Sequence, residues 1–191
     1  MLKLKLPLIL ASKSPRRREL LSKTGLDFDI FSMDVDESFS DEMPVEQVAE
    51  YLARKKGQAY ETKFPQHLII AADTTVVTAD EVLNKPADKG EAFQMIDKLR
   101  GKQHAVITGV CIVSPGKQHS FSETTQVSFG DLSDEEINYY IQQYKPFDKA
   151  GAYGIQEWIG LIGIESINGS YYNVVGLPVK KIYDYLKSFS V

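Results

Sequence analysis

Apolar and polar residues follow one another along this chain in two rhythms, one typical of β-strands and one typical of helices. Short apolar runs that are β-branched or that alternate with polar residues predict strands at residues 6–12, 27–33, 67–78, 104–113, 120–129 and 161–167. Apolar residues three and four positions apart predict helices at residues 15–24, 44–60, 88–100, 133–144 and 178–189. Because these elements succeed one another without linkers or repeats, the pattern predicts an α/β fold in a single domain over residues 1–191.

Capping and turn residues mark the boundaries of these elements. Ser14 precedes a proline and can cap the first helix, while Asp88 and Ser133 are each followed three residues later by a glutamate, as in a capping box. The turn TADE at 78–81 predicts a hairpin back along the strand before it. The Pro-Gly pair at 115–116 predicts antiparallel pairing of the two long strands around it.

Composition and charge exclude several functional classes. The chain is 43% hydrophobic, and its net charge of -4 argues against a surface that coats nucleic acid, so any positive potential must be local. The segment MLKLKLPLIL lacks the apolar core of a signal peptide or membrane span, which predicts a cytoplasmic protein. With a single cysteine, Cys111, and three histidines, there is no disulfide framework and no zinc motif. A metal would therefore be a hard ion held by carboxylates and substrate oxygens.

Arg16, Arg17 and Arg18 fall in the first turn of the first predicted helix, where cations are electrostatically unfavourable. Three arginines at a strand-to-helix turn therefore suggest that an anion such as a phosphate sits among them. The alternative is a solvated basic surface with no ligand.

Asp73 stands in the middle of the most apolar predicted strand, where a carboxylate is costly unless it is paired or bound to a cation. It is either the salt-bridge partner of a buried lysine or part of a site for Mg²⁺ or Mn²⁺. The second interpretation draws support from an acidic cluster after another predicted strand, formed by Asp34, Asp36 and Glu37. Such a cluster can equally be a solvated loop.

Two lysines, Lys56 and Lys85, are candidates for binding the same phosphate as the arginines. Lys56 continues the apolar stripe of the predicted helix 44–60, whereas Lys55 does not, so Lys56 either points inward or snorkels to the surface. Lys85 precedes a proline at the end of the predicted hairpin, which favours an extended backbone. Both can reach a phosphate chain, although neither spacing is diagnostic.

Five sequence blocks, in order and spacing through almost the whole chain, resemble the Maf family. They are LASKSPRRRELL, AADTTVV, NKP, DKAGAYGIQ and INGSYYNVVGLP, and the first and fourth are the most specific. The resemblance is closest to the branch of the family that acts on dTTP and UTP. It implies a nucleoside triphosphate pyrophosphatase that cleaves between the α- and β-phosphates. It also implies a twisted mixed β-sheet with flanking helices, in two lobes around a central cleft.

The resemblance assigns roles to individual positions. Asp73 is expected to accept a proton, and substrate choice is expected to depend on Arg16, Thr74 and Gln156. The positions expected around phosphate and metal are Ser12, Arg16, Glu37, Lys56, Asp73 and Lys85. The chain departs from the family at Gly57, where alanine is usual, at Thr75, where an aliphatic residue is usual, and at Glu157, where glycine is common. Glu157 matters most, because a carboxylate near the base site can alter selectivity.

The residues are chemically consistent with this role. A triphosphate carries roughly three to four negative charges, which Arg16, Lys56, Lys85 and a divalent cation can neutralise. Metal and carboxylate together can deprotonate the attacking water. The amide of Gln156 offers both a donor and an acceptor, which suits the N3–H and carbonyl edge of uracil or thymine.

Two alternatives belong to other functional classes. The chain could be a nucleotide-binding regulator of cell division without significant catalysis, in which case it would release no pyrophosphate. It could also bind single-stranded nucleic acid, but the acidic net charge and the lack of an aromatic and basic groove pattern argue against this. The expected partner is therefore a small nucleoside triphosphate, with no nucleic acid and no membrane. A homodimer is compatible with the sequence.

Overall fold

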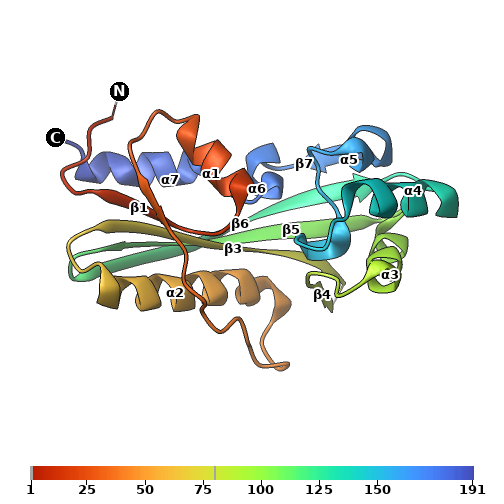
Figure 1. Cartoon of the computed structure of the whole chain (residues 1–191), viewed down its shortest axis with the longest axis horizontal. Coiled ribbons are helices and arrows are strands. Elements are labelled where there is room, and N and C mark those ends of the chain that lie inside the picture. Colours follow the sequence, from red (N-terminus) through yellow and green to blue (C-terminus); the bar gives the residue numbers. More distant parts are fainter. Residues whose placement is uncertain (1, 80) are drawn as a thin grey trace. The chain divides into compact units, whose positions relative to one another are not determined.

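The computed structural model of the protein describes residues 2–79 and 81–191. Its sheet has seven strands, in the order β2-β1-β3-β5-β6-β7 with β4 paired to β3 (Figure 1). The strands are β1 (Leu8–Ala11), β2 (Asp29–Phe31), β3 (Leu68–Thr78), β4 (Glu81–Leu83), β5 (Gln103–Ser114), β6 (Lys117–Phe129) and β7 (Ile164–Asn168). Strands β2, β1 and β3 run parallel, whereas β4 and β7 are antiparallel to their neighbours. The predicted α/β class with a mixed sheet and flanking helices is confirmed.

The predicted helix starts are confirmed by their caps. The Ser14 side chain accepts a hydrogen bond from the Arg17 N–H, and Asp88 accepts one from the Glu91 N–H. Ser133 forms both halves of a capping box. The α-helices are α1 (Pro15–Ser22), α2 (Val45–Lys63), α3 (Lys89–Leu99), α4 (Asp134–Tyr144), α5 (Trp158–Gly163), α6 (Tyr171–Val175) and α7 (Val179–Leu186). Two 3₁₀ turns complete the list, η1 (Ala150–Ala152) and η2 (Lys187–Phe189). Within the described ranges, no helix is both long and apolar enough to cross a bilayer.

The chain divides into two compact units. The first contains residues 1–73, 108–123 and 176–191, and the second contains residues 74–107 and 124–175. In the first unit, α1 and α7 cover one face of the parallel strands and α2 covers the other (Figure 1). The register pairs Ala11, the last residue of β1, with Ala71 of β3, so β3 continues past the end of β1 and carries Asp73 just beyond it.

Two glycines allow α2 to lie very close to the sheet in the first unit. A Cβ atom at Gly109 of β5 would lie 2.2 Å from the backbone carbonyl of Ala49 in α2. A Cβ atom at Gly57 of α2 would lie 2.6 Å from Cys111 Sγ. Both distances are far below van der Waals contact, so glycine is required for this approach. Gly57, where the family usually has alanine, therefore leaves the space that the buried Cys111 side chain needs.

The second unit is built around β4, β7 and the helices that connect the strand segments. Strand β4 pairs with the end of β3, with Val76 opposite Leu83. Helix α3 packs against both α4 and η1. The buried Asn173 of α6 donates to the Val106 carbonyl at 3.0 Å and to the Thr125 hydroxyl at 2.9 Å. These bonds hold α6 against β5 and β6.

One predicted element was partly wrong. The strand expected at 161–167 begins only at Ile164, and the residues before it belong to the short helix α5. A short apolar run does not distinguish a strand from a buried helical turn, which explains the error. Helix α6 was not predicted, because five residues carry too little periodicity to reveal it. The predicted turn at 78–81 includes residue 80, which lies outside the described residues.

Candidate active site

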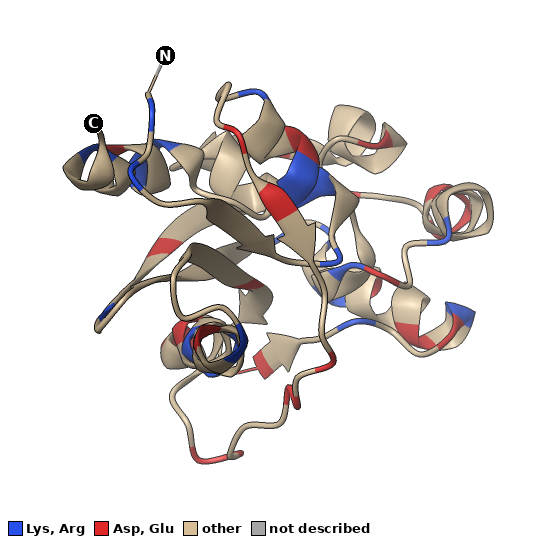
Figure 2. Cartoon of the chain, turned by 60° about the vertical axis from the view of Figure 1, so that its left-hand side comes forward, with Lys and Arg blue, Asp and Glu red and all other residues tan. Residues whose placement is uncertain are grey.

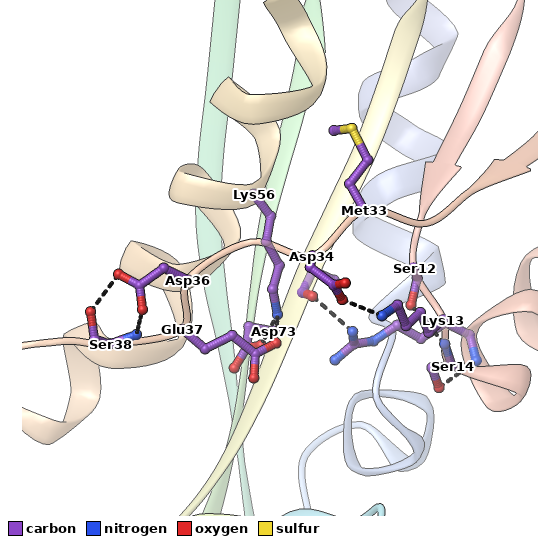
Figure 3. A network of polar contacts seen from close by, with 12 residues as sticks. Ser12, Lys13, Ser14, Met33, Asp34, Asp36, Glu37, Ser38, Lys56 and Asp73 are labelled. Carbon is purple, nitrogen blue, oxygen red and sulfur yellow. Dashed lines mark hydrogen bonds and ion pairs between the residues drawn. The ribbon is translucent and has the colours of Figure 1, made fainter. Parts of the chain in front are cut away.

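Asp73 lies on β3 and faces α2. Alternation along the strand puts Asp73 on the same face as Ile69 and Ala71, which are both buried beneath α2 in the core cluster that includes Ala53. Lys56 of α2 points to the same place, and its Nζ lies 2.5 Å from Asp73 Oδ1 (Figure 3). Each of the two side chains is only 14% exposed. Of the two orientations left open for Lys56, the structure therefore shows the inward one, and Asp73 is the partner of a lysine that is largely buried.

Glu37 joins this pair from the segment between β2 and α2. Glu37 Oε1 lies 2.8 Å from Lys56 Nζ, so two carboxylates converge on one ammonium group (Figure 3). The segment is held to α2 by the Tyr60 hydroxyl, which accepts from the Met33 N–H at 2.7 Å and donates to the Phe31 carbonyl at 2.9 Å. Tyr60 thus fixes the start of the stretch that brings Glu37 to the lysine.

The other two members of the acidic cluster have different partners. Figure 2 shows acidic positions along the segment between β2 and α2, in contrast to the basic start of α1. Asp34 pairs with Lys13 at 2.5 Å on the surface. Asp36 accepts from Lys55 at 2.7 Å and from the Ser38 hydroxyl at 2.6 Å, and these hydrogen bonds hold the pKa of its carboxyl well below the ordinary value. Glu37 is therefore the member of the cluster that shares a partner with Asp73.

The turn from β1 to α1 is organised by serine side chains. Ser12 immediately follows β1, and its Oγ accepts from the Ser14 N–H at 3.1 Å. Ser14 in turn caps α1, so the two hydroxyl residues define the turn that presents Arg16. Arg16 is half-buried in the first turn of the helix. The predicted strand–turn–helix geometry, which suits an anion, is therefore present at Ser12 and Arg16.

Arg17 plays a part that the sequence did not reveal. Its Nε donates to the Gly176 carbonyl at 2.8 Å, and one terminal nitrogen donates to the Ala72 carbonyl at 2.7 Å. Burial lowers the pKa of the guanidinium, although the nearby charge of Asp73 partly opposes this shift. Two of the three guanidinium nitrogens of Arg17 thus bond to the backbone, and the anion expected among the three arginines stays a prediction. Arg17 ties α1 to the backbone just before Asp73.

Three predicted site residues belong to the second unit. Thr74 follows Asp73 in β3 and is half-buried. Lys85 and Gln156 are both exposed, Lys85 just after β4 and Gln156 in the loop between η1 and α5. The structure therefore brings together Asp73, Glu37 and Lys56 by direct contact, while Ser12 and Arg16 follow β1 in the same unit.

The loop that carries Gln156 is braced by residues the sequence analysis did not connect. Glu157 accepts a hydrogen bond from the Tyr140 hydroxyl and lies 3.0 Å from Lys149 Nζ. On the other side, Tyr153 shares a 2.8 Å hydrogen bond with His104, whose pKa is lowered to about 4 by burial. Glu157 is thus engaged within its own loop. The sequence separation between Glu157 and its partners, Tyr140 and Lys149, does not predict these contacts. They depend on how the loop folds back on α4.

Comparison with known proteins finds relatives of this chain over nearly its whole length. The profile of the Maf family, described as Maf-like protein, matches residues 7–189. A protein of Parabacteroides distasonis named dTTP/UTP pyrophosphatase is 52% identical over 187 residues, which cover 97% of each chain. A protein of the same name from Phocaeicola vulgatus is 51% identical over 185 residues, which cover 96% of each chain.

A likeness to a solved structure concerns the fold alone. The Ham1 protein of Staphylococcus aureus superimposes with a TM-score of 0.58 at 15% identity, covering 95% of this chain and 98% of that one. The family profile and the relatives, by contrast, extend over nearly the whole sequence. The chain belongs to the family of Maf-like proteins.

Proposed function

We propose that this protein is a pyrophosphatase that hydrolyses dTTP and UTP to the nucleoside monophosphate and pyrophosphate. The observation that carries the proposal is the convergence of Asp73 and Glu37 on Lys56, in a chain half identical to proteins named dTTP/UTP pyrophosphatase. A fixed carboxylate beside cationic groups suits attack by water on a phosphate anhydride. Those relatives match this chain over 96–97% of its length, which supports the same substrates here.

Asp73 is proposed to accept the proton of the attacking water. A general base must be held within hydrogen-bond reach of the proton that it removes. The contact between Lys56 and Asp73 Oδ1 orients the carboxylate, and Arg17 holds the backbone of the preceding residue. The water attacks the α-phosphorus, and pyrophosphate leaves as the bond to the β-phosphate breaks.

Cationic residues are proposed to hold the triphosphate. Arg16 lies at the start of α1, where the backbone N–H groups and the helix dipole also favour an anion. Ser12 contributes a hydroxyl group at the same turn. The resemblance to the Maf family adds Lys85 as a further cation for the phosphate chain. The Lys56 ammonium group can pair with a phosphate oxygen in place of Glu37 or Asp73 and keep its position. Together these groups offset the charge of a bound triphosphate.

The donor set also fits a divalent cation, Mg²⁺ or Mn²⁺. Glu37 and Asp73 approach one positively charged group in the structure, and two carboxylates together with water and phosphate oxygens are the ligands that such ions prefer. When bound, the ion would neutralise phosphate charge and lower the pKa of water. We propose that Glu37 and Asp73 hold it.

Base selection is assigned to Gln156, with Thr74 and Arg16. Gln156 is exposed, and its amide offers one acceptor and one donor group to the N3–H and carbonyl edge of uracil or thymine. Cytosine presents the opposite pattern at that edge, so it would be read less well when the amide is held in the orientation that fits uracil. The cytoplasmic location and the homodimer stay predictions.

A nucleotide panel tests the proposal. Purified protein is incubated with each common nucleoside triphosphate plus Mg²⁺ or Mn²⁺, and pyrophosphate and nucleoside monophosphate are quantified. We expect both products in equal amounts, fastest from UTP and dTTP, and no reaction after treatment with EDTA until a divalent ion is restored. Binding of UTP without pyrophosphate release would instead support a regulator that only binds nucleotide. Full activity after exhaustive chelation would contradict the metal proposal.

A further inference from the structure

Gln156 occupies a turn whose backbone is closed by a hydrogen bond. The Glu157 N–H donates to the Gly154 carbonyl at 3.0 Å, which makes residues 154–157 a tight turn. Ile155 is only 8% exposed, whereas Gln156 is exposed. The turn therefore buries one central side chain as an anchor and presents the next one outward.

The same turn is closed a second time through side chains. The Gly154 N–H donates to the Tyr140 hydroxyl at 3.0 Å, and that hydroxyl donates to Glu157 Oε2. Tyr140 is fully buried in α4, so the bridge stands on a rigid element. Together with the backbone bond, these contacts join Gly154 to Glu157 twice, and the backbone of Ile155 and Gln156 lies between the two joined residues. We call this closed set of hydrogen bonds the ring.

Lys149 extends the ring to the beginning of the loop. Its Nζ lies 3.0 Å from Glu157 Oε1 and 2.8 Å from Asp148 Oδ1, and its side chain is 9% exposed. Gly154 leaves room for this packing, because a Cβ atom there would lie 2.9 Å from the Glu157 carboxylate. The ion pair with Glu157 lies mostly away from solvent, at 9% exposure for Lys149 and 24% for Glu157, so opening it would remove a partner from a carboxylate that water only partly reaches.

Tyr140 stays a hydrogen-bond donor across the range of pH in which proteins work. Burial and then the Glu157 carboxylate raise the pKa of its phenol far above the ordinary value. The Tyr140 hydroxyl therefore keeps the proton that it donates to Glu157.

We propose that Glu157 is a positioning residue that fixes the turn carrying Gln156, through Tyr140 and Lys149, and thereby sets selectivity for uracil and thymine. The inference rests on the proposed function, in which Gln156 reads the base. Glu157, which stands where glycine is common in the family, was expected to alter selectivity from a place near the base. The carboxylate acts on selectivity by holding the neighbouring side chain in place, and does not contact the base.

The test compares Glu157→Gln and Tyr140→Phe with the wild-type protein. Glu157→Gln keeps the shape but removes the charge that faces Lys149, and Tyr140→Phe removes one hydroxyl group and keeps the buried ring. We expect each change to reduce the preference for UTP over CTP, as a ratio of kcat/KM values, by about tenfold, the effect typical of losing a buried hydrogen bond. Tyr144→Phe is the matched control, since it removes a hydroxyl group from a neighbouring, more exposed ring of α4 and should leave the ratio unchanged.

A double-mutant comparison separates positioning from general damage. In a Gln156→Ala background, Glu157→Gln should have no further effect on the ratio, because the side chain that it positions is gone. An additional tenfold loss in that background would overturn the inference. So would Glu157→Gln and Tyr140→Phe proteins that both retain the wild-type preference.

Hydrogen exchange distinguishes failure of this inference from failure of the proposed function. If the wild-type protein released no pyrophosphate from UTP or dTTP, the proposed function would be wrong, and the positioning claim would rest on exchange at the amides of residues 154–157. We expect faster exchange there in both variants, with no change in α4. Unchanged protection of these amides would overturn the positioning role, whatever the activity.

Discussion

Lys56 of α2 and Asp73 of β3 form an ion pair in which Lys56 Nζ lies 2.5 Å from Asp73 Oδ1. Each of the two side chains is only 14% exposed. Glu37 contacts the same ammonium group at 2.8 Å. A carboxylate in an apolar strand is tolerated here because it is paired. The sequence allowed either a salt bridge or a chemical role for Asp73. The structure shows the salt bridge, and the proposed chemical role would use it to orient the carboxylate.

Asp73→Asn tests the role of this carboxylate. Asparagine keeps the size and one acceptor but removes the base and one negative charge. We therefore expect kcat for UTP to fall by at least ~10², the usual effect of losing a general base. Circular dichroism should show an intact fold, because Lys56 keeps its contact with Glu37. Asp36→Asn is the control, since Asp36 pairs with Lys55 on the surface and should be dispensable. A folded Asp73→Asn protein with near-normal turnover would refute the assignment.

Gln156→Glu tests base reading. The carboxylate keeps an acceptor but loses the amide donor, so UTP and dTTP should lose roughly ten- to a hundredfold in kcat/KM. CTP should lose less, because its amino group can donate to the new carboxylate. The same change at Gln142, exposed on α4, is the control. An equal loss for all three nucleotides would mean that Gln156 shapes the loop and does not read the base.

Gly57→Ala tests how closely α2 packs on the sheet. Alanine normally stabilises a helix relative to glycine by about 1 kcal/mol. Here its Cβ would lie 2.6 Å from Cys111 Sγ, so overpacking should reverse the sign and lower the free energy of unfolding by about 1 to 3 kcal/mol. In a Cys111→Ala background the penalty should shrink, because the closest atom is removed. Strictly additive effects in urea denaturation would contradict this account.

Thr75→Val tests a second departure from the family pattern. Thr75 is 2% exposed, and its hydroxyl has no hydrogen-bond partner among the described residues. Valine has nearly the same shape and no polar atom to desolvate, so the free energy of unfolding should rise by about 1 kcal/mol. A lower melting temperature for Thr75→Val would show that the hydroxyl is satisfied, for example by a buried water.

The parts of the structure that could be predicted from the sequence are those set by local rules. Ser14, Asp88 and Ser133 cap their helices because a short oxygen-bearing side chain can reach a nearby backbone N–H. The helical period placed Lys56 on the apolar stripe and Lys55 off it, and their different partners, Asp73 and Asp36, agree with this placement. The period did not decide between an inward and a snorkelling Lys56, because a long side chain on that stripe can do either.

The parts that could not be predicted depend on contacts distant in the sequence. Arg17 looked like one of three equivalent cations, but its guanidinium ties α1 to a carbonyl beside Asp73, 55 residues away. Glu157 looked like a charge near the base site, but its carboxylate turns to Tyr140 and Lys149. No local pattern records such pairings, because they arise only when the loop and the helix pack together.

Hydrolysis of UTP and dTTP in water enriched in ¹⁸O tests the central claim most directly. Attack of water on the α-phosphorus places one labelled oxygen in UMP or dTMP and none in pyrophosphate, and mass spectrometry of both products measures it. We predict label in the nucleoside monophosphate alone, in equal amounts with unlabelled pyrophosphate. Label in the pyrophosphate, or release of orthophosphate with a nucleoside diphosphate, would contradict the proposed reaction.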